Sequence, residues 1–158
     1  MTKSQHKPRI DAPSFNSATS EGEVTHKGGY HQPGDAFYTR SRGRVSCGCK
    51  KTTEKGMYRD VLVEMPDGRR VRFYHQSPVV VESTDGRLRL DSHGYKAKGG
   101  MSGSSTTKER INSELPRGFR LYQEDFVWYV SLPDGDRVEF EDGMIINPAE
   151  GTAYDPKA

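Results

Sequence analysis

The chain has 158 residues, of which 32% are hydrophobic and 29% are charged, and its mean hydropathy is −0.88. This length allows one domain of ordinary size, and the polar composition predicts that part of the chain lies outside a packed core. No apolar run reaches the ~18 residues of a membrane-spanning helix, and the N-terminus has no apolar signal-peptide region. We therefore expect a soluble, cytoplasmic protein without a membrane partner.

Composition divides the chain into four segments. Residues 1–34 are polar and show no hydrophobic period, which predicts a disordered N-terminal arm. Residues 35–56 are predicted to be a basic, partly ordered segment, residues 57–147 a β-rich domain, and residues 148–158 a C-terminal tail.

An imperfect internal repeat indicates the architecture of the β-rich domain. Val63–Phe73 returns as Val130–Phe140 with identical residues at seven of eleven positions. Both copies read as two strands joined by a Pro-Asp-Gly turn, because proline presets φ and glycine accepts a positive φ. Between the copies the charge inverts, from Arg69 to Asp136 and from Arg72 to Glu139. We expect the two hairpins to present surfaces of opposite sign.

The predicted elements follow in chain order as two meanders around one helix. The first meander contains strands at Val61–Met65, Val71–His75, Val79–Glu82 and Leu88–Leu90. The continuous apolar run of the third strand indicates burial on both faces or a bulge. A short helix is predicted to begin at Thr106, which forms a capping-box pattern with Glu109, and to stop at Pro116.

The second meander begins at Phe119 and contains the aromatic strand Phe126–Val130 and a last strand at Met144–Ile146. Phe126, Trp128 and Val130 alternate with Val127 and Tyr129, which predicts a central strand that is covered on both faces. Taken together, the pattern predicts a mostly β fold. We expect a small antiparallel barrel or a bent sheet, built from two related meanders with one short helix.

Charge is unevenly distributed along the chain. Residues 1–110 contain 20 Lys and Arg against 12 Asp and Glu, a net charge of +8, and residues 111–158 contain 4 against 10, a net charge of −6. A basic face of this kind favours binding of nucleic acid with low sequence specificity. The candidate residues for this face are Arg40, Arg42, Arg44, Lys50, Lys51, Arg70, Arg72, Arg87, Arg89, Lys108 and Arg110.

Each part of this basic face has an alternative interpretation. The segment around Arg40 to Lys51 can be a solvated loop whose charge only aids solubility. The alternating arginines of the first meander can pair internally with Glu64, Glu82 or the acidic second hairpin. Lys108 and Arg110 can remain in water while neighbouring residues cap the helix.

A second hypothesis assigns function to the acidic third of the chain. Carboxylates there can imitate nucleic acid toward a basic protein, which predicts a protein-binding module. The candidate residues are Glu124, Asp125, Asp136, Glu139 and Asp142. The opposite signs of the two hairpins also leave head-to-tail self-association open.

Catalytic and metal-binding signals are weak. Cys47 and Cys49 form a C-x-C pair that supplies only two ligands, and no histidine stands at a recognised zinc spacing from it. No paired carboxylates and no nucleophile with a base occur at recognisable spacing. We expect no metal, no cofactor and no enzymatic activity.

Several motifs appear in a fixed order between Arg72 and Ile146. They are Tyr74-His75, Gly94-Tyr95, Thr106–Asn112 (TTKERIN), Trp128-Tyr129-Val130 and Phe140–Met144 (FEDGM). With them the sequence resembles uncharacterised small accessory proteins of tailed bacteriophages, from which it departs by an extra loop at Lys98–Ser105. The resemblance implies a phage or prophage origin and the host cytoplasm as location. In that setting the second hypothesis describes an inhibitor of a host enzyme or defence complex, or a minor virion component.

Overall fold

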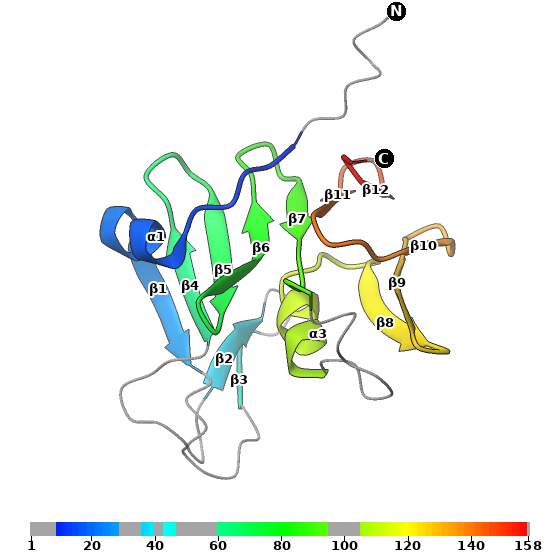
Figure 1. The fold of residues 1–158 in the computed structure, drawn as a ribbon, viewed down its shortest axis with the longest axis horizontal. Coiled ribbons are helices and arrows are strands. Elements are labelled where there is room, and N and C mark those ends of the chain that lie inside the picture. Colours follow the sequence, from blue (N-terminus) through cyan, green and yellow to red (C-terminus); the bar gives the residue numbers. More distant parts are fainter. Residues whose placement is uncertain (1–8, 29–35, 40–42, 47–59, 95–104, 158) are drawn as a thin grey trace, which may run out of the picture.

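A computed structural model describes residues 9–28, 36–39, 43–46, 60–94 and 105–157. The protein is mostly β (Figure 1). Two helices are described, α1 (Phe15–Glu21) and α3 (Ser105–Asn112). The strands are β1 (Glu23–Gly28), β2 (Ala36–Thr39), β3 (Gly43–Ser46), β4 (Asp60–Glu64), β5 (Arg70–Tyr74), β6 (Ser77–Glu82), β7 (Leu88–Leu90), β8 (Arg120–Glu124), β9 (Val127–Ser131), β10 (Arg137–Glu139), β11 (Met144–Asn147) and β12 (Thr152–Tyr154).

The strands form a large sheet and two small ones. The large sheet has seven strands in the order β1-β4-β5-β6-β7-β11-β12, and all of its neighbouring pairs are antiparallel. A three-stranded sheet has the order β10-β9-β8, and β2 pairs with β3. The two predicted meanders are therefore present, but β11 leaves the second one and joins the large sheet beside β7.

Three hairpin turns share one local structure. In the β4–β5, β6–β7 and β9–β10 turns, an aspartate side chain accepts a hydrogen bond from the backbone two residues later, and the following glycine has a φ between 90° and 97°. An L side chain is strained at such a φ, whereas glycine is not. The predicted Pro-Asp-Gly turns are confirmed, and Thr84-Asp85-Gly86 forms the same turn without proline.

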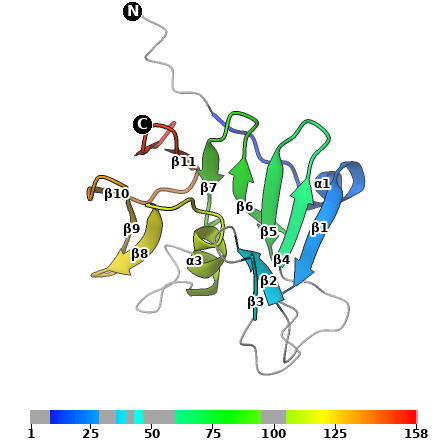
Figure 2. The same ribbon diagram turned by 180° about the vertical axis from the view of Figure 1, so that it is seen from behind.

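The large sheet is buried on both faces, so the molecule has three layers (Figures 1 and 2). On one face, α3 and the three-stranded sheet pack over residues that include Leu88, Leu90 and Ile146. On the other face, α1 and the N-terminal segment pack over residues that include Val63, Phe73 and Val81. The prediction that Val79–Val81 is buried on both faces is confirmed, and the β5–β6 register shifts at Arg72/Phe73.

The sheets do not close into a barrel within the described residues, and the bent-sheet alternative fits the structure. The helix begins at Ser105, one residue before the predicted start. It packs through Ile111, and Leu115 follows in the next turn, both of them buried as expected. Asn112 exchanges two hydrogen bonds with the Leu121 backbone, which joins the helix to β8.

Two described segments outside residues 57–147 contribute helices or strands. Residues 9–28 of the expected disordered arm contribute α1 and β1, with Ile10 and Ala18 buried. Their apolar residues are spaced irregularly because they pack against a sheet rather than against one another. In the expected tail, β12 pairs with β11, and the Tyr154 hydroxyl accepts a hydrogen bond from Arg87.

The aromatic strand is covered on one face only. Trp128 and Val130 are buried against the core, whereas Val127 and Tyr129 are half-buried. Phe126 lies before β9, in the β8–β9 turn, and 66% of it is exposed. The prediction of a strand covered on both sides was wrong because the described residues place no layer over the outer face of the three-stranded sheet.

Candidate functional site

Four arginines of the predicted basic face, Arg70, Arg72, Arg87 and Arg89, lie on opposite faces of the large sheet. Arg70 and Arg72 of β5 point toward the layer that contains α3, in the same rows as Glu82 and Val80. Arg89 lies in the row of Val81 and Ile145, on the face that packs beneath the N-terminal segment. Arg87 precedes it by two residues and shares that face, because strand side chains alternate with period two. These four side chains therefore do not share one face of the sheet.

Arg72 is fully buried, with 0% of its side chain exposed. Its Nη1 lies 2.6 Å from both carboxylate oxygens of Asp60, and its Nη2 lies 2.8 Å from Glu114 Oε2. Burial lowers the pKa of Arg72, but the charges of Asp60 and Glu114 outweigh that effect and leave the pKa above its usual value. This guanidinium has no access to an external phosphate.

Arg70, Arg87 and Arg89 are also paired. Arg70 contacts Glu114 at 3.1 Å and Glu82 at 3.9 Å. Arg87 donates to Asp85 and Arg89 donates to Asp91, each at a distance of 2.8–2.9 Å. The alternative of internal pairing therefore holds, and it includes the expected partner Glu82. Sequence reasoning missed Asp60, Glu114 and Asp91 because their proximity depends on register and on the placement of α3.

The basic residues of α3 are engaged as well. Arg110 is 3% exposed, contacts Glu109 at 2.7 Å and lies 5.1 Å over the Tyr74 ring. Lys108 donates to Gln123 and lies 5.0 Å over the Trp128 ring, and burial lowers the pKa of its ammonium group. Arg40, Arg42, Lys50 and Lys51 lie outside the described residues, as do Cys47 and Cys49, and Arg44 is described only as part of β3.

The acidic candidates fall into two groups. Asp125, Asp136 and Glu139 are exposed around the three-stranded sheet, and Glu124 forms an exposed ion pair with Arg137 at 2.8 Å. Asp142 has a structural position instead. Its Oδ1 accepts hydrogen bonds from the backbone and hydroxyl of Ser92, and its Oδ2 accepts from the Gly94 backbone. Asp142 therefore connects the β10–β11 turn to the end of β7.

The outer face of the three-stranded sheet carries an ordered aromatic cluster. Tyr122 and Tyr129 are directly opposite each other on β8 and β9, with ring centroids 5.8 Å apart. Arg137 of β10 stacks 3.8 Å over the Tyr129 ring and donates to the Tyr122 hydroxyl and to Glu124. These hydrogen bonds raise the pKa of Arg137. We call this cluster of Tyr122, Tyr129 and Arg137, together with Phe126 in the β8–β9 turn of the same sheet, the outer aromatic face.

Among the residues whose side-chain exposure the structure describes, Phe126 is the one large hydrophobic residue that is exposed. It follows Asp125 in the tight β8–β9 turn, where φ is 52° at Asp125 and 69° at Phe126. Such a turn favours Asn-Gly, and a bulky residue there is an outlier. Backbone strain of this kind persists where the surrounding structure holds it and is concentrated at functional sites. In the sequence, this position could have been recognised from the run Glu124-Asp125-Phe126, in which two acidic residues and an aromatic residue connect two strands.

Neither a metal-binding cluster nor a membrane-spanning helix is present in the part of the chain that the structure describes. Among these residues, no three His, Cys, Asp or Glu side chains lie together in a group suited to a metal ion. No helix in the described ranges is both long and apolar enough to cross a membrane.

Comparison with protein-family models, with curated proteins and with solved structures finds no match. The fold and the candidate site define a class of protein. It is a small, three-layered β-rich protein that carries an aromatic cluster on the outer face of its three-stranded sheet.

Proposed function

We propose that this protein is a non-enzymatic binding module that docks a basic protein partner through the outer aromatic face. The observation that carries the proposal is Phe126, which is 66% exposed and held on a backbone conformation unfavourable to its side chain. Aromatic residues and arginine are the residue types most enriched at binding hot spots. Tyr122, Tyr129 and Arg137 contact one another on the strands that precede and follow the β8–β9 turn, so little of their side-chain freedom is lost on binding.

The charge around this face specifies the partner. Asp125, Asp134, Asp136 and Glu139 are all exposed near the cluster, and Arg137 is already paired with Glu124. Acidic side chains at the rim of an interface attract a basic partner and repel an acidic one. A polyanion such as nucleic acid is therefore disfavoured here, whereas a basic protein surface with an apolar pocket for Phe126 is complementary. If the chain has the phage origin that its resemblance implies, that partner is a protein of the host cytoplasm.

Binding of nucleic acid through the described arginines is disfavoured for a different reason. Arg72 and Arg110 are buried, and Arg70, Arg87 and Arg89 are held by carboxylates. Phosphate contacts require cations that exchange condensed counterions at the surface. A nucleic-acid function is thus left to the segment that contains Arg40, Arg42, Lys50 and Lys51.

A site-specific crosslink tests the proposal with the full chain. Benzoylphenylalanine replaces Phe126 in one version and Arg117, which is exposed on the α3–β8 connection, in a control version. We expect a discrete adduct with a basic bacterial protein from position 126 and none from position 117. The captured protein is then purified, and Phe126→Ser is expected to weaken its affinity at least tenfold, whereas Asn16→Ser, at an exposed position of α1 on the far side of the large sheet, leaves it unchanged.

Charge reversal separates the two hypotheses. Asp136→Lys with Glu139→Lys is expected to abolish the adduct, whereas Arg40→Glu with Arg42→Glu is expected to leave it intact. Identical adducts from positions 126 and 117 would overturn the proposal. A second result would also overturn it. In that result no protein adduct forms, and the chain binds single-stranded DNA or RNA in a salt-sensitive way that is lost in the Arg40/Arg42 variant.

A further inference from the structure

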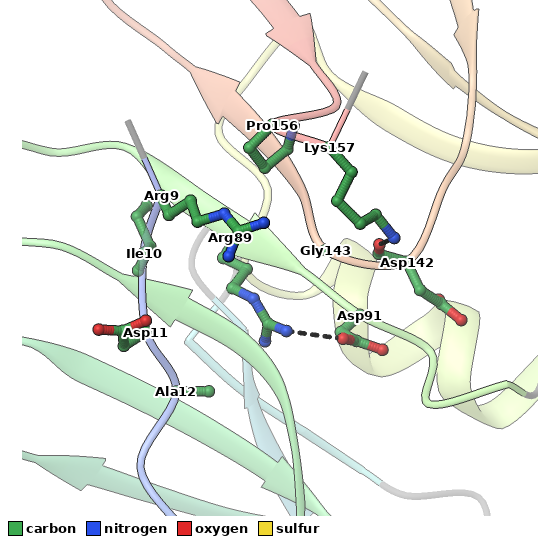
Figure 3. Close-up of a pocket in the computed structure, with 10 residues that line it drawn as sticks. All are labelled: Arg9, Ile10, Asp11, Ala12, Arg89, Asp91, Asp142, Gly143, Pro156 and Lys157. Carbon is green, nitrogen blue, oxygen red and sulfur yellow. Dashed lines mark hydrogen bonds and ion pairs between the residues drawn. The ribbon is translucent and has the colours of Figure 1, made fainter. Parts of the chain in front are cut away.

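We propose that a cavity between the two ends of the chain binds a small ligand through a phosphate group. The cavity has a volume of about 350 Å³ and is formed by four separate segments (Figure 3). These are the N-terminal segment at Arg9–Ala12, the end of β7 at Arg89 and Asp91, the β10–β11 turn at Asp142-Gly143, and the C-terminal segment at Pro156-Lys157. Its volume lies within the range of small-molecule sites.

Arg89 supplies the first unsatisfied donor. The residue stands on the face of the sheet that includes Val81 and Ile145, and its Nη2 donates to Asp91 Oδ2 at 2.9 Å. Its Nη1 is buried and has no hydrogen-bond partner among the described residues. A buried N–H group is costly to leave without an acceptor, so this atom is a candidate donor to a ligand in the cavity.

Two further cations converge on the same space. Arg9 is exposed, and Figure 3 shows its side chain extending toward Arg89. Lys157 approaches from the opposite end of the chain, and its Nζ donates to the Asp142 carbonyl at 2.8 Å. An ammonium group has three donors, so this single bond leaves Lys157 able to contact a ligand.

The Asp91 and Asp142 carboxylates that line the cavity already accept hydrogen bonds from the protein. Both oxygens of the Asp142 carboxylate accept hydrogen bonds from Ser92 and Gly94, and the group points away from Arg89 in Figure 3. Asp91 accepts from the His93 backbone at 2.7 Å and from Arg89. The Asp11 side chain also points away from Arg89. Arg89 Nη1 and the remaining N–H groups of the Lys157 ammonium therefore have no acceptor among the described residues.

A phosphate monoester fits this arrangement better than a carboxylate does. It carries a charge of about −1.5 to −2 at neutral pH and three strong acceptor oxygens, enough for one contact with each cation. Guanidinium groups match the geometry of phosphate oxygens closely. Because the three cations come from β7 and from both ends of the chain, a bound phosphate would tie the terminal segments to the large sheet. Binding therefore stabilises the folded protein.

The test is a titration of the full chain with inorganic phosphate at constant ionic strength, with acetate as the carboxylate control. Thermal unfolding and the NMR resonance of Arg89 Nε–H are followed together. We expect phosphate to raise the unfolding temperature saturably and to shift the Arg89 resonance, while acetate does neither. Ribose 5-phosphate and phosphoserine, used as separate probes, then distinguish which organic group extends into the cavity.

Variants connect the effect to the named cations. Arg9→Gln alters an exposed side chain and leaves the fold intact, and we expect it to raise the dissociation constant for phosphate about tenfold. Lys157→Gln is expected to act in the same direction, whereas Arg117→Gln is the matched control without effect. The absence of saturable binding at millimolar phosphate would overturn the proposal, and so would equal affinities for phosphate and acetate or equal effects of Arg9→Gln and Arg117→Gln. None of these outcomes depends on the outer aromatic face.

Discussion

Arg72 and Asp60 form a fully buried ion pair in which Arg72 Nη1 lies 2.6 Å from both carboxylate oxygens of Asp60. The two residues are on neighbouring strands, β5 and β4, and Glu114 completes the cluster from the turn after α3. Within the sequence repeat, the position of Arg72 corresponds to Glu139, which is exposed on β10. At this position of the repeat, the first copy therefore has a buried arginine with a structural role, and the second copy has a carboxylate at the surface.

Replacing Arg72 tests how much the fold depends on this pair. Arg72→Met removes the buried cation from between Asp60 and Glu114 and leaves these carboxylates their contacts with Arg110 and Arg70, and we expect the free energy of unfolding to fall by about 3–5 kcal/mol. Chemical denaturation at neutral pH measures the change. Arg120→Met, at an exposed position of β8, is the control and is expected to change stability by less than about 0.5 kcal/mol. Equal, small effects of both substitutions would contradict a structural role for the pair.

Gly22 tests the docking of the N-terminal segment. An added Cβ at this position would lie 2.7 Å from Glu64 O and 2.7 Å from Val63 Cγ1, both on β4. Gly22→Ala is therefore expected to cost about 1–3 kcal/mol and to accelerate amide hydrogen exchange in β1. Ser17→Ala, on the exposed side of α1, is the matched control and should change neither quantity. Unchanged exchange in Gly22→Ala would mean that β1 does not pair with β4 as described.

Phe126 is expected to trade stability against binding. Its φ of 69° is unfavourable for a bulky residue and ordinary for glycine. Phe126→Gly should raise the free energy of unfolding by about 1 kcal/mol while removing the proposed docking side chain. Thermal unfolding and partner affinity are measured on the same variant. Phe126→Ala, which keeps the backbone strain, should lose affinity without the gain in stability, and a loss of stability in the glycine variant would count against strain at this turn.

Asp85 predicts a pH dependence in the β6–β7 turn. A hydrogen bond from the Ser83 hydroxyl, followed by one from the Arg87 backbone, lowers the pKa of Asp85 from 3.8 to about 2. A lowered pKa in the folded state means that the stabilisation is present above the unfolded pKa and is lost as the pH falls from about 4 toward 2. Ser83→Ala should raise the Asp85 pKa toward 3.8, as measured by carboxyl NMR titration. Thr84→Ala is the neighbouring control, and equal titration curves for the two variants would refute the assignment.

Local chemistry was enough to predict the turns and most strands. Asp67, Asp85 and Asp134 hydrogen-bond to the backbone two residues later, and glycine supplies the positive φ at the next position. These interactions span five residues at most, so the same sequence produces the same turn wherever it occurs. Alternation likewise placed Leu88 and Leu90 in the core, where they are 1% and 0% exposed.

The candidate sites could not be predicted in the same way. Arg72 and Arg89 both alternate with apolar residues, and only the pairing of β5, β6 and β7 places them on opposite faces of one sheet. Phe126 is exposed because the β8–β9 turn includes it. If β9 began one residue earlier, Phe126 would be a strand residue on the same face as Trp128. The cavity at Arg89 is formed by segments about 150 residues apart in the sequence. The sequence by itself determined the turns, the helix and the mostly β character, because these depend on neighbouring residues. Only the tertiary structure decided which charges are buried, paired or free to bind, because those states depend on strand register and on contacts between distant segments.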